Sequence, residues 1–291
     1  MIVSFILCLL IQLIVIKYAK SSVPIKEALT LHQVKAGISS FGSIGIYVSF
    51  STSILLLFRN KQSLMVLIMV SLFYGIGLLD DILKVKKRSS DGFSTLEKLI
   101  IQIFFSVFCV YLINTYFSRN LNYFLSVFYI VALVNAVNIT DGLDTLATKC
   151  SLGPLVLFFK FPYLREYTFI ALGAVLGFYI VNRHPAKIFM GDAGSHFIGS
   201  LLAILTLISG NIIIISICFL PFILECLSSL IQIISIRVFN YKVFSIAPFH
   251  HALENKGIKE VSITNYFFIF SIICTLISFL VLQFAYEIWC E

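Results

Sequence analysis

The sequence predicts an all-α polytopic membrane protein with about ten transmembrane helices. Of its 291 residues, 59% are hydrophobic and only 12% are charged, whereas soluble domains carry about 25% charged residues. Long apolar runs separated by short polar breaks recur along the whole chain. Because one spanning helix needs about 20 apolar residues, ten spans leave room only for short loops. We therefore expect residues 1–291 to form a single integral membrane domain, and a sizeable soluble domain is excluded.

Ten apolar runs are the expected spans, with boundaries that are soft by several residues. They are 1–19, 42–58, 63–79, 99–115, 123–137, 146–159, 168–181, 193–209, 212–236 and 263–288. The first run lacks the basic segment that opens a signal peptide, so we interpret it as an uncleaved span. The sixth run is short and contains Pro154, which a membrane helix tolerates when neighbouring helices pair the freed backbone groups.

The basic residues predict the orientation. If the amino terminus lies outside, 16 of the 21 lysines and arginines fall on the loops of one face, and the positive-inside rule makes this face cytoplasmic. Both termini are then extracytoplasmic. All six aspartates and all five histidines lie on or beside the same loops. Orientation does not require this, because acidic residues contribute little to it, so we expect chemistry at the cytoplasmic surface.

The charge and the cysteines exclude other classes of protein. A formal charge of +7 would suggest nucleic acid as the partner of a soluble protein, but here the basic residues signal topology. We expect no nucleic-acid partner. The seven cysteines are scattered, without a Cys-x-x-Cys pair or a Cys/His cluster, and indicate neither a zinc site nor a disulfide framework.

Two adjacent aspartates, Asp80 and Asp81, end the third run and are followed by Lys84. Adjacent carboxylates at a membrane boundary repel each other unless a cation or a basic group lies between them. Acidic residues next to the hydrocarbon core are functional candidates by default. We therefore favour a functional pair over an ordinary polar helix end that faces water.

The polar segment 135–144 follows the fifth run. Asn138, Asp141 and Asp144 are spaced three apart, so in helical backbone they would share one face and converge on one ligand. Gly142 allows a tight bend. The alternative is a capping turn in which Asp144 starts the sixth helix, which leaves the asparagines and Asp141 unexplained.

The segment 189–195 joins the seventh and eighth runs. Glycines before and after Asp192 permit close backbone approach. Ser195 stands at the start of the next helix, where N–H groups and the positive end of the helix dipole attract phosphate. For Ser195 alone a simple helix start is the better interpretation, whereas the whole Gly-Asp-Ala-Gly-Ser combination favours a functional site.

The last cytoplasmic loop contains a predicted short helix within 247–257, with proline near its start and glycine after its end. It would present His250, His251 and Glu254. Adjacent histidines point about 100° apart on a helix, which suits zinc poorly, so we prefer hydrogen bonding to an anionic substrate. Together the loops supply hard oxygen ligands and no soft ligand cluster, which indicates magnesium and phosphate chemistry at the membrane.

In this order the motifs resemble the polyprenyl-phosphate N-acetylhexosamine-1-phosphate transferase superfamily, and within it the phospho-N-acetylmuramoyl-pentapeptide transferase branch. The resemblance covers nearly the whole chain. It runs through Gly-Leu-Leu-Asp-Asp with Lys84, Asn-Ala-Val-Asn-Ile-Thr-Asp-Gly-Leu-Asp, Phe-Met-Gly-Asp-Ala-Gly-Ser, residues 225–232, and Ala-Pro-Phe-His-His with Glu254 and Lys256-Gly257. The last of these motifs selects the branch.

The resemblance implies a magnesium-dependent enzyme of the bacterial inner membrane whose active site faces the cytoplasm. Such enzymes join phospho-N-acetylmuramoyl-pentapeptide from a UDP-linked donor to undecaprenyl phosphate, which releases UMP and forms lipid I for peptidoglycan synthesis. By position, Asp192 matches the main magnesium ligand and Asn138 a further one. The residues that match catalytic positions are Asp80, Asp81, Asp192 and His250.

The resemblance also implies substrate contacts. Phe189 would stack on uracil, and His250 and His251 would face the diphosphate and the sugar. The positions on the substrate side are Lys35, Lys84, Asn135, Asn138, Asp141, Gly142, Leu143, Asp144, Asn182, Phe189, His250 and His251.

Three positions depart from the family pattern. Residues 38–43 replace a Thr-Pro-Thr-Met-Gly-Gly element, Ala252 replaces a third histidine, and Thr145 replaces a glycine. These changes put donor contacts and efficiency in question more than the reaction, because the aspartates remain.

Two alternatives stay open. One is the same chemistry with UDP-N-acetylglucosamine or a related amino sugar. The other is a non-catalytic scaffold or a transporter, although transporters usually place polar residues near the bilayer midplane. Homodimers are typical of the family, and Gly173-x-x-x-Gly177 fits a dimer face and packing within one chain equally well.

Overall fold

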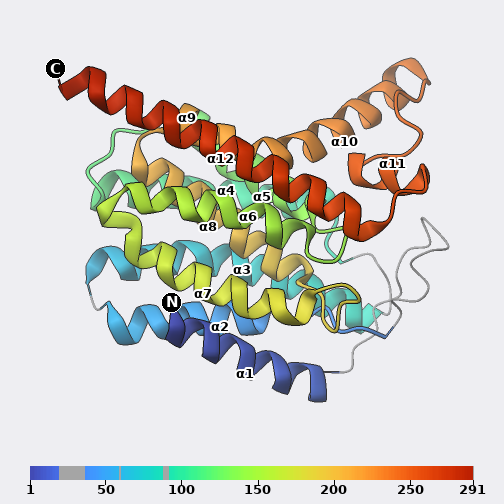
Figure 1. Cartoon of the computed structure of the whole chain (residues 1–291), viewed down its shortest axis with the longest axis horizontal. Helices are drawn as coiled ribbons and strands as arrows, with labels where there is room; N and C mark the ends of the chain where they lie inside the picture. Colours follow the sequence, from blue (N-terminus) through green and yellow to red (C-terminus); the bar gives the residue numbers. More distant parts are fainter. Residues whose placement is uncertain (20–36, 59, 88–91, 291) are drawn as a thin grey trace.

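The computed structural model describes residues 1–19, 37–58, 60–87 and 92–290, which form a bundle of helices that run mostly along one direction (Figure 1). The α-helices are α1 (Ile2–Tyr18), α2 (Ser43–Leu57), α3 (Lys61–Lys87), α4 (Thr95–Tyr116), α5 (Tyr123–Thr140), α6 (Leu146–Leu157), α7 (Arg165–Asn182), α8 (Gly191–Ser209), α9 (Ile212–Ser216), α10 (Leu220–Phe239), α11 (Phe249–Asn255) and α12 (Glu260–Cys290). These ranges contain no strand, so the predicted all-α class is confirmed.

Each of the ten apolar runs coincides with helix, and the predicted short helix of the last loop is α11. Among the described residues, seven helical segments are long and apolar enough to cross a membrane. Helices α1 and α2 are apolar but shorter, and α6 has only 12 residues. The helices therefore indicate a membrane protein, while the number of ten spans and the side of the termini stay predictions.

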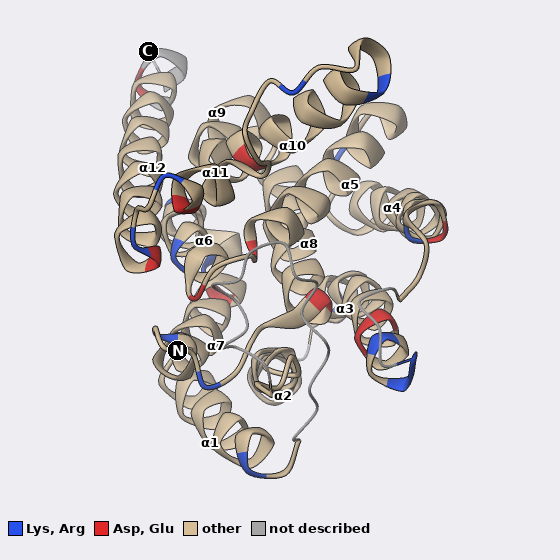
Figure 2. Ribbon diagram, turned by 90° about the vertical axis from the view of Figure 1, so that its right-hand side faces the viewer, with Lys and Arg blue, Asp and Glu red and all other residues tan. Residues whose placement is uncertain are grey.

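Helix α8 lies in the middle of the bundle, packed against α3 and α5 (Figure 2). All its residues from Ala193 to Ser209 are buried. At its carboxyl end, Arg119 Nε donates to the Ile208 carbonyl at 2.7 Å. A cation at this end is favourable because the helix dipole is negative there. The central helix is therefore tied at its carboxyl end by a charged side chain from outside it.

The carboxyl ends of two helices differ from prediction in ways that move the site residues. Helix α3 continues past Leu79 to Lys87, because the basic residues of its last turn favour the carboxyl end of a helix. Asp80 and Asp81 consequently lie inside the helix. Helix α5 ends at Thr140, so Asn138, Asp141 and Asp144 do not share one helical face, and that expectation was wrong.

The glycine pair of α7 packs within the chain. A Cβ at Gly173 would meet Ser4, and a Cβ at Gly177 would meet Cys8, both on α1. Small residues let two helix backbones approach closely in this way. The sequence allowed either a dimer face or packing within one chain, and in the structure these glycines pack against α1 of the same chain.

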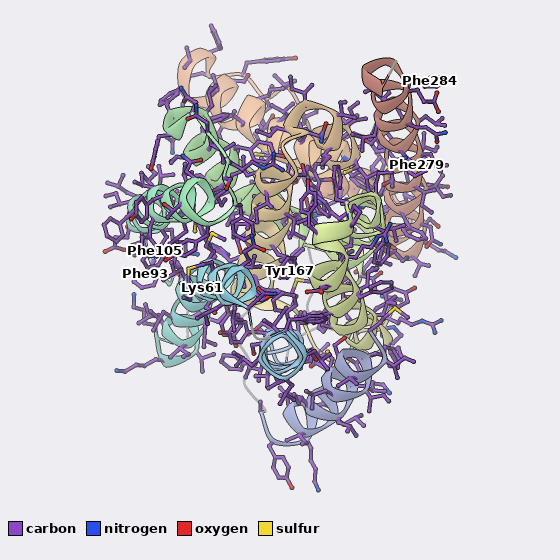
Figure 3. All side chains as sticks on the ribbon, turned by 90° about the vertical axis from the view of Figure 1, so that its left-hand side faces the viewer. Lys61, Phe93, Phe105, Tyr167, Phe279 and Phe284 are labelled. Atoms are coloured by element: carbon purple, nitrogen blue, oxygen red, sulfur yellow. The ribbon has the colours of Figure 1, made fainter. Side chains whose placement is uncertain are left out.

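The outer surface of the bundle is apolar, as helices in lipid require. In Figure 3, Phe279 and Phe284 of α12 lie at the outside, where they are 40% and 62% exposed. Tyr167 of α7, by contrast, is only 3% exposed, and its hydroxyl lies 3.3 Å from Ser63 Oγ on α3. This buried hydroxyl thus finds a partner on a neighbouring helix, as is favourable away from water.

Candidate active site

Four charged side chains from three helices meet at the amino end of α8. Lys84 Nζ lies 2.8 Å from Asp80 Oδ2 and 3.0 Å from Asp192 Oδ2, and Lys98 Nζ of α4 lies 2.7 Å from both oxygens. The Asp80 side chain is fully buried, whereas the other three keep 16–19% of their surface exposed. This lysine–aspartate cluster (Asp80, Lys84, Lys98 and Asp192) is balanced in charge and reachable from outside.

Asp81 contacts a different partner from Asp80. Its carboxylate oxygens accept the backbone N–H groups of Asp192 at 3.1 Å and of Ala193 at 2.9 Å, so it caps the first turn of α8. Adjacent residues on a helix project about 100° apart, which separates the two carboxylates. Gly191, with a φ of +74°, permits the approach, because a Cβ there would meet the Asp81 carboxylate. The adjacent acids therefore have different direct partners, lysines for Asp80 and backbone N–H groups for Asp81.

A buried chain of hydrogen bonds runs from Asp192 to Asn135. His196 Nδ1 lies 2.7 Å from the Asp192 carbonyl oxygen, and Gln102 Nε2 lies 3.0 Å from His196 Nε2. Asn135 Nδ2 donates to Gln102 Oε1 at 2.7 Å and to the Val131 carbonyl at 2.8 Å. The chain connects α8, α4 and α5, and it occupies the amide nitrogen of Asn135, a predicted substrate contact.

Asn138 meets Ser195 beside the cluster. The Ser195 hydroxyl lies 3.1 Å from both Asn138 Oδ1 and the Asp192 carbonyl oxygen, to which it can donate. The expectation that Ser195 starts this helix was wrong, because α8 begins at Gly191 and Ser195 lies in its second turn. The amide oxygen predicted as a magnesium ligand therefore faces the first turns of α8.

The turn after α5 is organised by two predicted substrate contacts, Asp144 and Asn182. Asn182 Oδ1 accepts the Thr145 N–H at 2.9 Å, and its Nδ2 donates to the Ile188 carbonyl at 2.9 Å. Asp144 Oδ2 accepts the Ala186 N–H at 3.1 Å. Both side chains tie the turn to the segment that leads into α8.

Asp144, His184 and Glu260 form a second group of ionisable side chains. His184 Nδ1 lies 2.9 Å from Asp144 Oδ2 and 3.5 Å from Glu260 Oε2, and one ligand atom of each residue lies within 4.8 Å of the others. This spacing is compatible with a metal ion. An imidazole nitrogen suits a transition metal better than magnesium, so this group is a poorer magnesium site than the carboxylates of the cluster.

His250 lies on α11 against Glu225 of α10. The Glu225 carboxylate accepts the His250 backbone N–H at 3.1 Å and lies 2.9 Å from Nδ1, so Nδ1 carries a proton. The buried Nε2 has no hydrogen-bond partner among the described residues. A Cβ at Gly142 would meet Nε2, so this nitrogen faces the turn after α5. His251 Nδ1 lies 2.7 Å from Glu254 Oε2.

Helix α10 holds the last loop with a row of polar side chains. Ser228 Oγ accepts the Phe249 N–H at 3.0 Å, and the Gln232 amide pairs with both backbone groups of Phe244 at 2.9 Å. Glu225, Ser228 and Gln232 follow one another at helical spacing and share one face. They fix the loop from which α11 presents its histidines.

The first loop pairs with the segment before α8. The Phe189 N–H donates to the Ser39 carbonyl at 2.8 Å, and the Gly42 N–H donates to the Phe189 carbonyl at 2.9 Å. The side chain of Phe189 is half-buried. The departing residues 38–43 are thus in contact with a predicted site residue, whereas Lys35 lies outside the described residues.

Several partners in these groups are absent from the predicted site: Gln102, Lys98, His184, His196, Glu225 and Glu260. Lys98 and Glu225 could have been identified from the sequence, because charged side chains in or beside apolar runs are functional candidates by default. Gln102 carries no such signal. Its place in the site follows from the packing of α4 on α8 and not from any local pattern.

The carboxylates of Asp80 and Asp192 fit a magnesium ion by their chemistry. Both Oδ2 atoms contact the same two ammonium groups, so they converge on a shared positive partner. Carboxylate oxygens are the hard ligands that magnesium takes in proteins. The ammonium groups of Lys84 and Lys98 would compete with a divalent cation for these oxygens.

Comparisons with known proteins agree on one family. Residues 63–210 match glycosyl transferase family 4. The chain is 34% identical over 275 residues to a phospho-N-acetylmuramoyl-pentapeptide-transferase of Clostridium botulinum, covering 86% of this chain and 84% of that protein. It is 35% identical to the Orientia tsutsugamushi protein of the same name, covering 84% and 80%. For the Thermotoga petrophila protein the identity is 33%, with 87% of each chain covered.

Proposed function

Since this chain belongs to glycosyl transferase family 4, and within it to the phospho-N-acetylmuramoyl-pentapeptide transferases, we propose that it makes lipid I. It transfers phospho-N-acetylmuramoyl-pentapeptide from the UDP-linked donor to undecaprenyl phosphate and releases UMP, a step of peptidoglycan synthesis. The observation that carries this proposal is the lysine–aspartate cluster, which lies at a helix amino end beside an apolar groove.

The proposed setting is the bacterial inner membrane, crossed ten times, with both termini outside and the site facing the cytoplasm. The uneven distribution of lysines and arginines supports this orientation. A site at the interface lets a soluble nucleotide donor meet an acceptor that is anchored in lipid.

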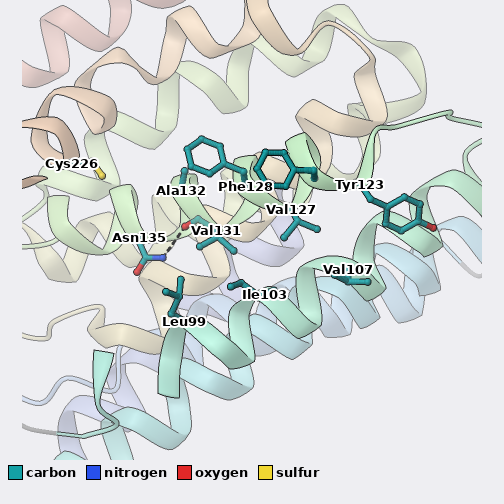
Figure 4. A pocket seen from close by; sticks show the side chains of 11 residues that line it. Leu99, Ile103, Val107, Tyr123, Val127, Phe128, Val131, Ala132, Asn135 and Cys226 are labelled. Carbon is teal, nitrogen blue, oxygen red and sulfur yellow. Dashed lines mark hydrogen bonds between the residues drawn. The ribbon is translucent and has the colours of Figure 1, made fainter. Parts of the chain in front are cut away.

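The apolar groove suits the polyprenyl chain of the acceptor. It lies along α4 and α5 with Cys226 of α10 at its side, and it has a volume of about 520 Å³ (Figure 4). Leu99 and Asn135 line one end and Tyr123 the other. Leu99 directly follows Lys98 in the chain, so a chain bound in the groove can hold its phosphate near the cluster.

The lysines of the cluster suit the phosphate groups of both substrates. In phosphoryl transfer, charge spreads over the phosphoryl oxygens while the leaving group departs, and positioned cations stabilise that charge. Lys84 and Lys98 stand where they can exchange a carboxylate partner for a phosphate oxygen. Asp80, which already contacts both ammonium groups, orients them toward the acceptor phosphate.

The proposed cofactor is magnesium, held by Asp192 and Asp80 with the Asn138 amide oxygen nearby. When bound, the ion would supply positive charge to the diphosphate of the donor. The observation in support is the convergence of two carboxylate oxygens at the amino end of α8.

We assign the donor to the other half of the site. Phe189 would stack on uracil, and Asp144 and the backbone of residues 141–143 would contact the uracil and the ribose. His250 and His251 would face the diphosphate and the sugar. The buried Nε2 of His250, which lacks a partner among the described residues, supports this assignment because an unpaired buried polar atom is costly.

The test is transfer by the purified chain in lipid nanodiscs with magnesium. We expect UMP release from UDP-N-acetylmuramoyl-pentapeptide that requires undecaprenyl phosphate, with one lipid I formed per UMP, measured by chromatography and mass spectrometry. Removing the metal with EDTA should stop the reaction, and adding magnesium should restore it.

The other outcomes of this test identify the alternatives. UMP release from UDP-N-acetylglucosamine alone would move the protein to a different donor with the same chemistry. No release from any UDP-linked amino sugar would overturn the proposed enzyme and leave a scaffold or a transporter.

A further inference from the structure

We propose that Asp81 and His196 are positioning residues that clamp the backbone of Asp192 from both sides, Asp81 at its N–H group and His196 at its carbonyl group. Neither side chain then acts on substrate. The consequence for turnover rests on the proposed function, because it assumes that Asp192 acts in the transfer. The clamp itself depends only on the geometry of α3, α4 and α8.

Asp81 holds the amino side of the clamp. It is 2% exposed, and both of its carboxylate oxygens accept N–H groups from the first turn of α8, those of Asp192 and Ala193. These groups have no partner within the helix itself, and a carboxylate at a helix amino end is favoured by the dipole. The close approach of α3 to α8 is fixed by Gly77, where a Cβ would meet the backbone of Asp192.

His196 holds the carbonyl side, and its tautomer follows from its neighbours. Because Gln102 Oε1 already accepts a hydrogen bond from Asn135, the Gln102 amide nitrogen must donate to His196 Nε2. Nδ1 therefore carries the proton and donates to the Asp192 carbonyl at 2.7 Å. His196 is 0% exposed, and both of its ring nitrogens have hydrogen-bond partners inside the bundle, so we assign it no contact with substrate.

The clamp leaves the Asp192 side chain as the part of the residue that faces outward, with 16% of its surface exposed. Its backbone is fixed to α3 through Asp81 and to α4 through His196 and Gln102. A reacting group that shifts by about 1 Å can lose about 100-fold in rate. Loosening the clamp should therefore lower kcat while the KM values for donor and acceptor stay unchanged.

The first test compares two substitutions of His196, one that keeps a hydrogen-bond donor and one that keeps only the volume of the side chain. In His196→Asn, the side-chain amide nitrogen can take the place of Nδ1 and donate to the Asp192 carbonyl. In His196→Leu, the volume is kept and the donor is lost. We expect His196→Leu to lower kcat by about 100-fold with unchanged KM values, and His196→Asn to recover most of this loss.

A matched control lies one turn further along α8. Ser200 is also fully buried, and its hydroxyl donates to the Phe197 carbonyl at 3.0 Å, but it does not contact Asp192. Ser200→Ala should leave kcat unchanged. The proposal is overturned for His196 if His196→Leu keeps the wild-type kcat, or if His196→Asn is as slow as His196→Leu while both proteins remain folded.

The second test measures the clamp without any turnover. Hydrogen–deuterium exchange at the amides of Asp192 and Ala193 should be at least about tenfold faster in Asp81→Ala than in the wild type. Asp81→Asn keeps one acceptor oxygen and should fall between the two. If Asp81 served only as a catalytic base, exchange at these amides would not change, and the clamp would be disproved.

The two tests also separate this proposal from the proposed function. If the wild-type protein releases no UMP, the proposed reaction fails, but the exchange result still decides whether Asp81 clamps α8. If UMP is released and exchange does not respond to Asp81, the reaction stands and the clamp fails.

Discussion

The acidic residues at the two sides of the site have different partners. Around the amino end of α8, Asp80 and Asp192 are paired with lysines. Around α11 and α12, Glu225 and Glu260 are paired with histidines. A lysine is a compact point charge on a flexible stem, whereas a histidine makes directional hydrogen bonds whose sense depends on its tautomer. The aspartate–lysine pairing suits the neutralisation of phosphate charge, and the glutamate–histidine pairing suits the orientation of a bound substrate.

The two regions also differ in how many partners each group has. Each ammonium group of the cluster contacts two carboxylates, so one contact can be given up to a ligand while the other remains. The His250 ring is fixed by Glu225 at Nδ1, and its Nε2 has no hydrogen-bond partner among the described residues. We infer that substitutions in the cluster affect the chemical step most, while those around His250 affect donor binding.

The largest effect should come from Asp192→Asn, which keeps the shape of the side chain and removes its charge. We expect UMP release to fall by at least about 1,000-fold, because one of the two converging carboxylates is lost. The measurement is turnover at saturating donor and acceptor, with the melting temperature in detergent as the check that the protein is folded. Activity within tenfold of the wild type would remove Asp192 from the proposed metal site.

A smaller loss is expected for Lys98→Met, about 100-fold in kcat, because Lys84 still contacts both carboxylates. The matched control is Lys86→Met on α3, an exposed lysine at the same end of the bundle, which should stay within twofold of the wild type. Equal losses in the two variants would show that general positive charge matters and that the position of Lys98 does not.

Glu225→Gln tests the histidine side of the comparison. The substitution keeps an acceptor for the His250 backbone but removes the charge that fixes Nδ1–H, so we expect about a tenfold loss, seen mainly as a higher KM for the UDP-linked donor. Glu166→Gln, an exposed acid at the start of α7, serves as the control. A loss confined to kcat would contradict the division of roles between the two regions.

The smallest expected effect is on stability, and it concerns Thr145 in the turn between α5 and α6. Thr145 has a φ of 68°, a left-handed conformation that costs a residue with a Cβ about 1–2 kcal/mol. Thr145→Gly should raise the melting temperature in detergent by about 2 °C, since part of that gain is offset by the flexibility of glycine in the unfolded chain. Thr148→Gly, inside α6, should lower it. An unchanged or lower melting temperature in Thr145→Gly would show that Thr145 makes a compensating contact.

Much of the fold could be predicted because hydrophobic runs report directly on helices. All ten runs coincide with helix, and most of the predicted site residues are brought to one end of the bundle. The pairings could not be predicted, because they join residues far apart in the chain. Lys98 and Asp192 are 94 residues apart, and no local pattern relates them.

The separation of Asp80 from Asp81 shows a different kind of limit. From the sequence, Asp80 and Asp81 were interpreted as one pair. They project in different directions because α3 continues past Leu79. A helix that stopped at Leu79 would have left both acids in a loop, where a shared cation is the natural expectation. Asp80 and Asp81 could therefore be chosen as candidate site residues from the sequence, while the difference between their partners became visible only with the helix boundary.

The groove along α4 and α5 has a consequence for how the acceptor is supplied. Phe124 and Phe128, which line it, are 79% and 68% exposed, so the groove faces the surroundings of the bundle and not its interior. For the proposed reaction, the acceptor arrives by lateral diffusion in two dimensions and never dissolves in water. Its effective concentration is a surface density, so an apparent KM for undecaprenyl phosphate should scale with the ratio of acceptor to total lipid and detergent. Diluting the whole assay mixture with buffer should leave it unchanged.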